Sequence, residues 1–117
     1  MNKIFYLSTC STCKRIMDEL TIGENFEKQD IKFDKITQEQ LDLMAQKAGS
    51  YEALFSKRSR QYRALGLHQK ALTEEDYKKY ILEEYTFLKR PVLLIGDDIF
   101  IGNSKKVVEA AAVALKQ

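Results

Sequence analysis

The sequence predicts an α/β protein in which helices pack on a four-stranded mixed sheet. Apolar runs and helical stripes follow the order β-α-β, then a helical insert, then β-β-α. One parallel βαβ unit followed by an antiparallel hairpin gives a mixed sheet. The length of 117 residues suits one domain, and the sequence has no repeat or linker. We therefore expect residues 1–117 to form a single domain, with the helical insert at about 37–86.

The first part of the chain carries a predicted strand, helix and strand. The apolar run Ile4–Leu7 suits a strand that is buried on both faces. A helix is expected from about Thr12 to Leu20, because its apolar residues repeat at helical spacing. Residues 23–25, Gly-Glu-Asn, break this helix, and a weaker strand is expected from Phe26 to Ile31.

The middle of the chain is predicted to be helical. Thr37 and Gln40 form a T-x-x-Q capping box, and Gly49 is expected to end the helix that they start. Between Tyr51 and Leu67 the pattern favours short helical pieces. A further helix is expected from Thr73 to about Glu84, because acidic residues fill its first turn.

The last part is predicted to form a hairpin and a helix. Pro91–Ile95 and Ile99–Ile101 are apolar runs separated by the turn sequence Gly-Asp-Asp at 96–98. Ser104 is a suitable N-cap for a final amphipathic helix.

The composition excludes several classes of protein. Two cysteines are too few for a small secreted protein built on disulfides, and with the single His68 they cannot supply four ligands to a zinc ion. The N-terminal apolar run is too short for a signal peptide or a membrane span. We expect a cytoplasmic protein without membrane contact, with no metal site, monomeric by default.

Cys10 and Cys13 form a C-x-x-C pair at the junction of the first strand and helix. The positive end of a helix favours a thiolate, and Lys14 and Arg15 add positive charge one turn away. Cys10 is expected to be exposed and activated, and Cys13, inside the first turn, to be less exposed and to resolve a mixed disulfide. The alternatives are two ordinary thiols in a small core, or a zinc ion shared by two copies of the chain.

Residues 56–70 carry a local charge of +5 without any Asp or Glu. Arginines in such a stretch can bind oxyanions or meet an acidic surface, although a solvated face is the simpler interpretation. Tyr62 is the only Phe, Tyr or Trp residue in this stretch, and one such residue is too few to indicate direct nucleic-acid binding. Arg90-Pro91 opens the hairpin, and a proline fits the start of a strand because no backbone N–H is needed there. The simplest interpretation of this pair is a structural turn.

Three segments together resemble the ArsC/Spx family, which comprises glutaredoxin-type arsenate reductases, Spx regulators and related reductase-like proteins. They are YLSTCSTCK at 6–14, LFSKRSRQYRALGL at 54–67, and KRPV at 89–92 followed by Gly102. The resemblance spans essentially the whole chain. It implies a thioredoxin-like fold with a helical insert, in agreement with the order of elements above.

The resemblance also implies roles for individual residues. Cys10 takes the place of the nucleophile, and Arg90 that of the anion-holding arginine before the proline. Pro91 would be cis and face Cys10, and Arg58 is the candidate for an arginine from the insert. We therefore expect Cys10, Cys13 and Arg90 to be catalytic. The expected substrate-binding residues are Thr12, Lys14, Arg58 and Pro91.

Two functions follow from the resemblance. The first is a thiol-disulfide or arsenate-reductase-like oxidoreductase, acting on a disulfide or a small oxyanion. It implies no bound cofactor, with glutathione or another thiol as reductant and glutaredoxin or thioredoxin as partner. The second is a redox-switched regulator like Spx, which binds the RNA polymerase α subunit. Single-cysteine arsenate reductases lack a counterpart of Cys13 and carry a third arginine where this chain has Gly102-Asn103. A third hypothesis is that the protein keeps this fold but has no catalytic activity.

Overall fold

The computed structural model describes residues 2–117, which form two compact units. The sheet unit contains the described residues up to Lys35 together with Arg90–Gln117, and the insert unit is Ile36–Lys89. The expectation of a single domain with an insert at about 37–86 stays a prediction.

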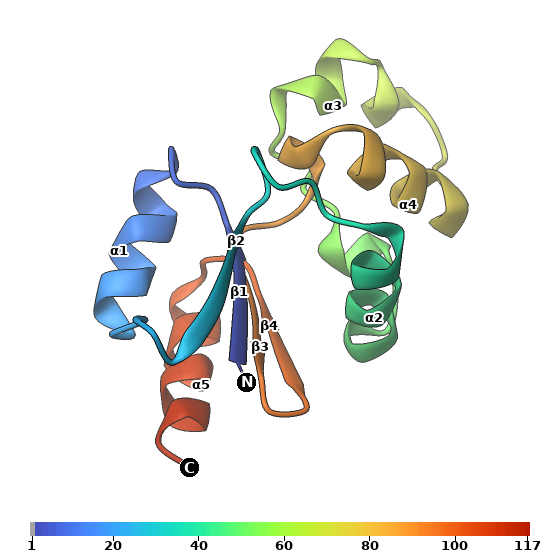
Figure 1. Cartoon of the computed structure of the whole chain (residues 1–117). Coiled ribbons are helices and arrows are strands. Elements are labelled where there is room, and N and C mark those ends of the chain that lie inside the picture. Colours follow the sequence, from blue (N-terminus) through green and yellow to red (C-terminus); the bar gives the residue numbers. More distant parts are fainter. Residues whose placement is uncertain (1) are drawn as a thin grey trace. The chain divides into compact units, whose positions relative to one another are not determined.

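The sheet unit is built on a four-stranded mixed sheet with the strand order β2-β1-β3-β4 (Figure 1). Its strands are β1 (Asn2–Tyr6), β2 (Phe26–Asp30), β3 (Val92–Ile95) and β4 (Asp98–Ile101). β1 pairs with β2 in parallel and with β3 antiparallel, and β3 pairs antiparallel with β4. The predicted α/β class and mixed sheet are confirmed.

Two helices cover one face of this sheet, α1 (Ser11–Glu19) and α5 (Lys105–Leu115) (Figure 1). They meet the sheet in one apolar core. Its buried members are Ile4, Ile16, Leu20, Phe26, Leu93, Ile95, Val108 and Ala111. Ile4 and Leu93 are cross-strand partners, so both point to the face that the helices cover. The apolar spacing of the sequence therefore predicts this core face correctly.

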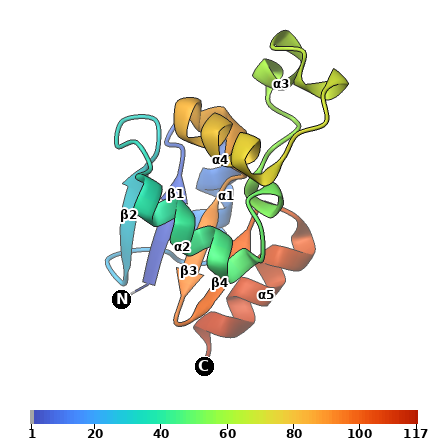
Figure 2. The ribbon, with the colours of Figure 1, turned by 90° about the vertical axis from the view of Figure 1, so that its right-hand side faces the viewer.

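The β3–β4 hairpin has a two-residue loop rather than the three-residue turn expected (Figure 2). Asp98 already pairs with Ile95 in the ladder, which leaves Gly96 and Asp97 in the loop. Gly96 has a φ of 59°. A glycine with positive φ at the first loop position is the pattern of a type II′ turn, which suits the twist of a hairpin.

The insert unit is helical, as predicted. Its helices are α2 (Gln38–Ala48), α3 (Arg60–Ala64) and α4 (Glu74–Glu83), with 3₁₀ turns at Glu52–Leu54, Leu67–Gln69 and Tyr85–Phe87. Thr37 and Thr73 each close a capping box at the start of a helix, and Gly49 ends α2 with a φ of 98°. The last 3₁₀ turn was not predicted from the sequence.

An aromatic cluster holds the insert unit together. The ring of Phe55 lies 5.0 Å from Phe87, 4.9 Å from Tyr77 and 5.9 Å from Tyr62, measured between centroids. Such pairs add to the free energy of burial through the geometry of their rings. The cluster therefore ties the middle of the insert to its C-terminal end.

A polar network joins α2 to α4 at the surface of the insert unit. The Tyr51 hydroxyl donates to Asp42 at 2.6 Å, and Lys78 Nζ lies 3.0 Å from the same carboxylate. The hydrogen bond from Tyr51, followed by the one from Lys78, lowers the pKa of Asp42.

In the part of the chain that the structure describes, no helix is long and apolar enough to cross a membrane.

Replacing Thr37 by Ala tests the capping box of α2. The Thr37 Oγ1 atom accepts the Gln40 N–H at 3.1 Å, and Gln40 Oε1 accepts the Thr37 N–H at 3.0 Å. We expect Thr37→Ala to lower the free energy of unfolding by about 1 kcal/mol, because one helical N–H loses its partner. Urea unfolding followed by circular dichroism measures this. Thr37→Ser keeps the hydroxyl and should unfold within a few tenths of a kcal/mol of wild type. An equal loss in both variants would contradict the role of the cap.

Candidate functional site: the cysteine pair and the cis-proline

Cys10 is the N-cap residue of α1. It follows the loop after β1, its N–H donates to the Leu7 carbonyl at 3.1 Å, and its own carbonyl accepts the Lys14 N–H at 3.2 Å. The backbone of Cys10 is extended, with φ −95° and ψ 112°. The sulfur makes no complete capping hydrogen bond, so the first N–H groups of the helix are available to a thiolate there.

The surroundings of Cys10 favour its thiolate form. Partial burial opposes ionisation, but the backbone N–H and the thiol of Cys13, the backbone N–H of Thr12 and the charge of Arg90 outweigh it. The net effect is a pKa of Cys10 below its ordinary value. A lowered pKa raises the fraction of nucleophilic thiolate at neutral pH. The predicted activation of Cys10 therefore has a physical basis in α1 and Arg90.

Cys13 differs sharply from Cys10. Its side chain has no solvent exposure, whereas Cys10 is half-buried, and both thiols are free. Burial, together with the neighbouring Cys10, raises the pKa of Cys13 to about 11. The predicted difference in exposure is confirmed. Cys13 thus keeps its proton under conditions in which Cys10 ionises.

Arg90 and Pro91 lie immediately before β3, and the peptide bond between them is cis. This confirms the conformation that the family resemblance implies. The Pro91 carbonyl accepts the Gly102 N–H at 2.9 Å, which ties the cis-proline to the end of β4. Arg90 lowers the pKa of Cys10 and of Cys13. Its guanidinium therefore acts on both thiols, although 80 residues separate it from Cys10.

Thr12 and Lys14 stand in the first turn of α1. Thr12 is half-buried and its N–H favours the Cys10 thiolate, whereas Lys14 is exposed. Among charged residues Arg90 has the largest effect on the pKa of Cys10. The role of both residues in substrate binding stays a prediction.

Arg58 belongs to the insert unit, whereas the other predicted site residues belong to the sheet unit. It is exposed in the loop before α3, next to Ser59, whose hydroxyl lies 2.7 Å from that of Thr86. Its predicted role beside the thiols stays a prediction.

Asp30 was missed by the sequence reasoning. At the end of β2 its carboxylate accepts the N–H of Ser8 at 3.4 Å and that of Lys32 at 3.2 Å. Ser8 lies in the loop that leads to Cys10, so Asp30 helps to hold that loop. The available signal was its position: Asp30 ends a strand parallel to β1, and the carboxyl ends of parallel strands meet at one edge.

Within residues 2–117, no group of three or more His, Cys, Asp or Glu side chains is arranged to hold a metal ion.

The chain matches one sequence family over most of its length. The profile described as the ArsC family matches residues 5–111. No curated protein gives a significant match.

Several solved structures share the fold. A YffB protein is 25% identical with a TM-score of 0.80, and the match covers 98% of this chain and 99% of that one. An arsenate reductase from Vibrio cholerae is 19% identical with a TM-score of 0.73, covering 92% of this chain and 95% of that one. An arsenate reductase (ArsC) related protein from Brucella melitensis is 20% identical with a TM-score of 0.70, and the match covers 93% of this chain and 92% of that one. The predicted thioredoxin-like fold is confirmed by these likenesses.

The reactivity of Cys10 should depend on pH in a defined direction. Because its pKa is lowered, alkylation by iodoacetamide should reach half its maximal rate below the pH of about 8.5 at which an ordinary cysteine does so. Arg90→Gln should move this midpoint to higher pH, because a positive charge that favours the thiolate is lost. Rates measured from pH 5 to 10, with modified residues identified by mass spectrometry, give the midpoint.

Lys14→Gln is the matched control, since it also removes one positive charge from this region. It should shift the midpoint less than Arg90→Gln does. Cys13 should stay unmodified in the folded protein at neutral pH, given its burial and its pKa of about 11. A wild-type midpoint at or above that of an ordinary cysteine would refute the activation of Cys10.

Proposed function

The chain belongs to the ArsC family, and from this premise we propose that it is a thiol-dependent reductase whose nucleophile is Cys10. The observation that carries the proposal is the contrast between the two thiols. The pKa of Cys10 is lowered and its side chain is partly accessible, while Cys13 is fully buried with its pKa raised to about 11. An ionised nucleophile beside a protonated second thiol is what a two-step thiol exchange requires.

For a disulfide substrate, the Cys10 thiolate attacks one sulfur and the substrate S–S bond breaks. A mixed disulfide forms at Cys10, and the other substrate sulfur leaves as a thiolate that takes up a proton. Cys13 then loses its proton and attacks the Cys10 sulfur, which releases the second substrate thiol and leaves a Cys10–Cys13 disulfide. Once Cys10 is bonded to sulfur, its negative charge no longer raises the pKa of Cys13, so ionisation becomes easier.

For an oxyanion substrate such as arsenate, the same Cys10 thiolate attacks the central atom, and one protonated oxygen of the oxyanion leaves as water. A second thiol then attacks the Cys10 sulfur and forms a disulfide with it. The bond between sulfur and the central atom breaks, and the central atom keeps the electron pair and is reduced by two electrons. The positive charge of Arg90 favours anions near Cys10, as its effect on the thiolate indicates. Thr12, Lys14 and Pro91 are proposed to line this position, and Arg58 to supply a second guanidinium. Arsenate is the first oxyanion to test, because one structural relative is an arsenate reductase.

The proposal needs an external source of two electrons and no bound cofactor. We propose glutathione or another cytosolic thiol, delivered directly or through glutaredoxin or thioredoxin. Such a reductant restores Cys10 and Cys13 to the free thiols after each turnover.

A coupled assay tests the proposal. Purified protein is mixed with glutathione, glutathione reductase and NADPH, and either bis(2-hydroxyethyl) disulfide or arsenate with glutaredoxin. NADPH oxidation above the background without protein is expected with at least one substrate. Cys10→Ser should return the rate to background, because the attacking sulfur is absent. Arg90→Gln should lower the rate by about 100-fold, the usual cost of losing one group that stabilises the reacting anion.

Cys13→Ser is the matched partner of Cys10→Ser. It should still attack a disulfide but accumulate the mixed disulfide at Cys10, which intact-protein mass spectrometry detects. If both serine variants retain wild-type rates, or wild type shows background rates with both substrates, the proposed reductase function is wrong.

A second function is favoured by the surface of the insert unit. Its basic residues Lys57, Arg58, Arg60, Arg63 and Lys70 are all exposed. Such a surface suits an acidic protein partner, and the cysteine pair could switch the contact as in Spx. This predicts that the C-terminal domain of the RNA polymerase α subunit binds the chain differently before and after oxidation of Cys10 and Cys13. A pull-down under reducing and oxidising conditions measures this. Absence of binding in both states would exclude the regulator.

A further inference from the structure

The chain passes from β1 to α1 through a β-turn, Leu7–Cys10. The Cys10 N–H donates to the Leu7 carbonyl at 3.1 Å, which closes the turn. Neither Ser8 nor Thr9 at its centre has a positive φ, and this is the pattern of a type I turn. Because α1 begins at the residue after Cys10, the turn sets where the sulfur lies relative to the first N–H groups of the helix.

Asp30 holds this turn from the neighbouring strand. It is the last residue of β2 and the register partner of Tyr6, the last residue of β1, so the two strands end at the same edge of the sheet (Figure 1). The Asp30 Oδ2 atom accepts the Ser8 N–H at 3.4 Å. Among the described residues, no other side chain forms a hydrogen bond with the backbone of Ser8 or Thr9. Asp30 therefore provides the side-chain tie between the turn and the sheet.

The Asp30 carboxylate is itself held by the loop that follows β2. Its Oδ1 atom accepts the Lys32 N–H at 3.2 Å, which is the arrangement of an Asx turn. The Asp30 backbone carbonyl accepts the Phe33 N–H at 3.1 Å and the Asp34 N–H at 2.8 Å. One carboxylate oxygen and the main chain are thus engaged within the loop, and the second oxygen is left for Ser8.

We propose that Asp30 is a positioning residue for Cys10: through the Ser8 N–H, its carboxylate fixes the Leu7–Cys10 turn and so keeps the Cys10 sulfur at the start of α1. This inference deepens the proposed reductase function, because it concerns the geometry of the same thiol. Asp30 acts on the reaction only through the turn.

The groups that stabilise the thiolate indicate what the turn contributes. The backbone N–H groups of Cys13 and Thr12 and the thiol of Cys13 favour the Cys10 thiolate, and the charge of Arg90 adds to them. Hydrogen bonds weaken steeply as their geometry departs from linear. A turn that is released from β2 lets the sulfur move away from these donors, so the pKa of Cys10 should rise.

The charge of Asp30 and its hydrogen bond act on Cys10 in opposite directions. A carboxylate near a thiolate opposes ionisation, so removal of the charge by itself lowers the pKa of Cys10. Loss of the hydrogen bond to Ser8 raises it. The direction of the shift therefore distinguishes a positioning role from a direct effect of charge.

The test is the pH midpoint of Cys10 alkylation by iodoacetamide in Asp30→Ala, with the modified residue identified by mass spectrometry. We expect the midpoint to rise by about 0.5 pH unit, the scale of one weakened hydrogen bond. The matched control is Asp34→Ala, which removes the same kind of side chain from the same loop. In the described part of the chain the Asp34 side chain is exposed and forms no hydrogen bond or ion pair, so this control should not raise the midpoint.

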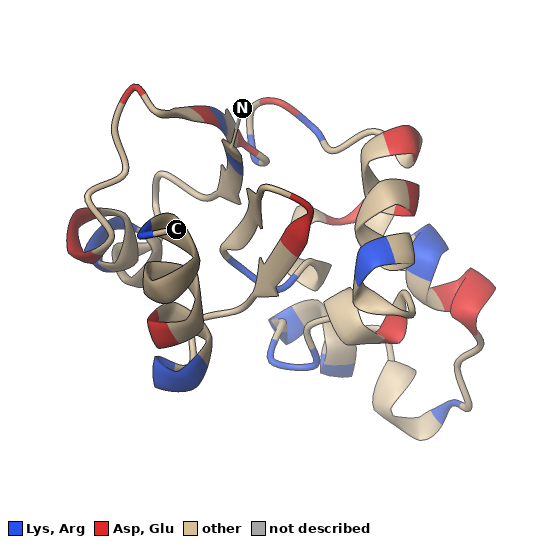
Figure 3. Ribbon diagram, turned by 90° about the horizontal axis from the view of Figure 1, so that it is seen from below, with Lys and Arg blue, Asp and Glu red and all other residues tan. Residues whose placement is uncertain are grey.

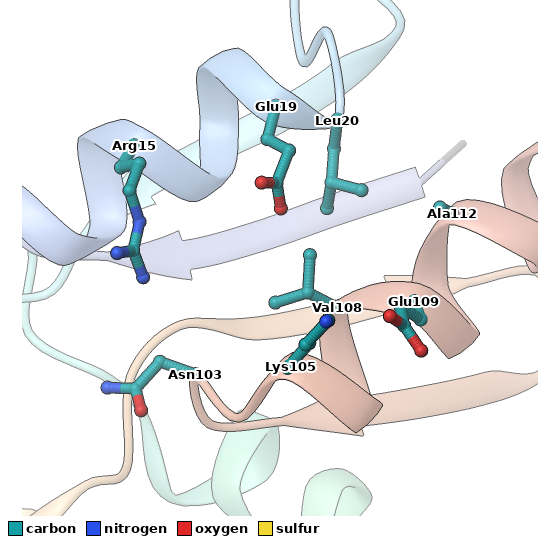
Figure 4. A pocket seen from close by; sticks show the side chains of 8 residues that line it. All are labelled: Arg15, Glu19, Leu20, Asn103, Lys105, Val108, Glu109 and Ala112. Atoms are coloured by element: carbon teal, nitrogen blue, oxygen red, sulfur yellow. The ribbon is translucent and has the colours of Figure 1, made fainter.

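A second control tests for a general effect of charge on the thiol. Glu109 is the acidic residue of α5 and gives the red segment on the helix that ends at the C-terminus (Figure 3). It is exposed and borders the groove between α1 and α5 (Figure 4). Glu109→Gln removes one negative charge from the sheet unit and leaves the Leu7–Cys10 turn intact, so any shift of the midpoint should be downward.

Variants of Ser8 remove the donor instead of the acceptor. Proline has no N–H and suits the first central position of a type I turn, so Ser8→Pro deletes the hydrogen bond to Asp30 and leaves every charge in place. The midpoint should rise as in Asp30→Ala, whereas Ser8→Ala keeps the N–H and should shift it less. The double variant Asp30→Ala/Ser8→Pro should shift no further than the larger single variant, because both changes remove the same interaction.

Urea unfolding followed by circular dichroism shows which variants are folded, and Ser8→Pro carries the test if Asp30→Ala does not fold. An unchanged or lower midpoint in the folded variant overturns the proposal, since Asp30 would then act only on stability or through its charge. Fully additive shifts in the double variant also overturn it, because the two residues would then act independently.

The outcome is distinct from that of the reductase assay. If wild type gives only background NADPH oxidation while Asp30→Ala and Ser8→Pro raise the midpoint, the positioning role stands and the reductase function fails. If wild type turns over and both variants keep its midpoint, the positioning role alone is wrong.

Discussion

The antiparallel pairing of β1 with β3 determines the candidate site. Phe5 stands opposite Val92 in this ladder, so the end of β1 lies beside the beginning of β3. Cys10 follows β1 and Arg90 precedes β3, and the pairing therefore brings the nucleophile and the guanidinium to one edge of the sheet. Neither segment contains a local signal for the other. Two unrelated stretches of chain become one chemical site because two central strands exchange backbone hydrogen bonds.

A difference in burial then gives the two cysteine side chains different pKa values. Cys10 is the N-cap residue of α1 and keeps contact with solvent, whereas Cys13, three residues later, faces the interior with no exposure. Free N–H groups and a nearby cation favour a negative charge, and an apolar interior opposes it. The same helix turn therefore lowers one pKa and raises the other. The C-x-x-C spacing separates the two pKa values only because α1 begins at the edge of the sheet, where Cys10 meets solvent and Cys13 points to the core.

α1 and α5 serve both the core and the surface of the sheet unit. Their inner faces carry Ile16, Leu20, Val108 and Ala111 into one apolar core. Between them, α1 and α5 also leave a groove that is lined by Leu20, Val108 and charged side chains of both helices. The sequence does not reveal this groove, since α1 and α5 are distant in the chain.

Local chemistry in the sequence was sufficient to predict most of the elements. The capping box at Thr37, the acidic first turn after Thr73, the turn at Gly96 and the apolar spacing of α1 act within a few residues, and they predicted helices, hairpin and sheet class. The cysteine pair at a helix start, with its family resemblance, also predicted the candidate site. Only the tertiary structure decided the dominant charge on Cys10, the role of Asp30 and the groove between α1 and α5. Each of these depends on contacts between distant segments, which strand register and burial fix and which no local pattern encodes.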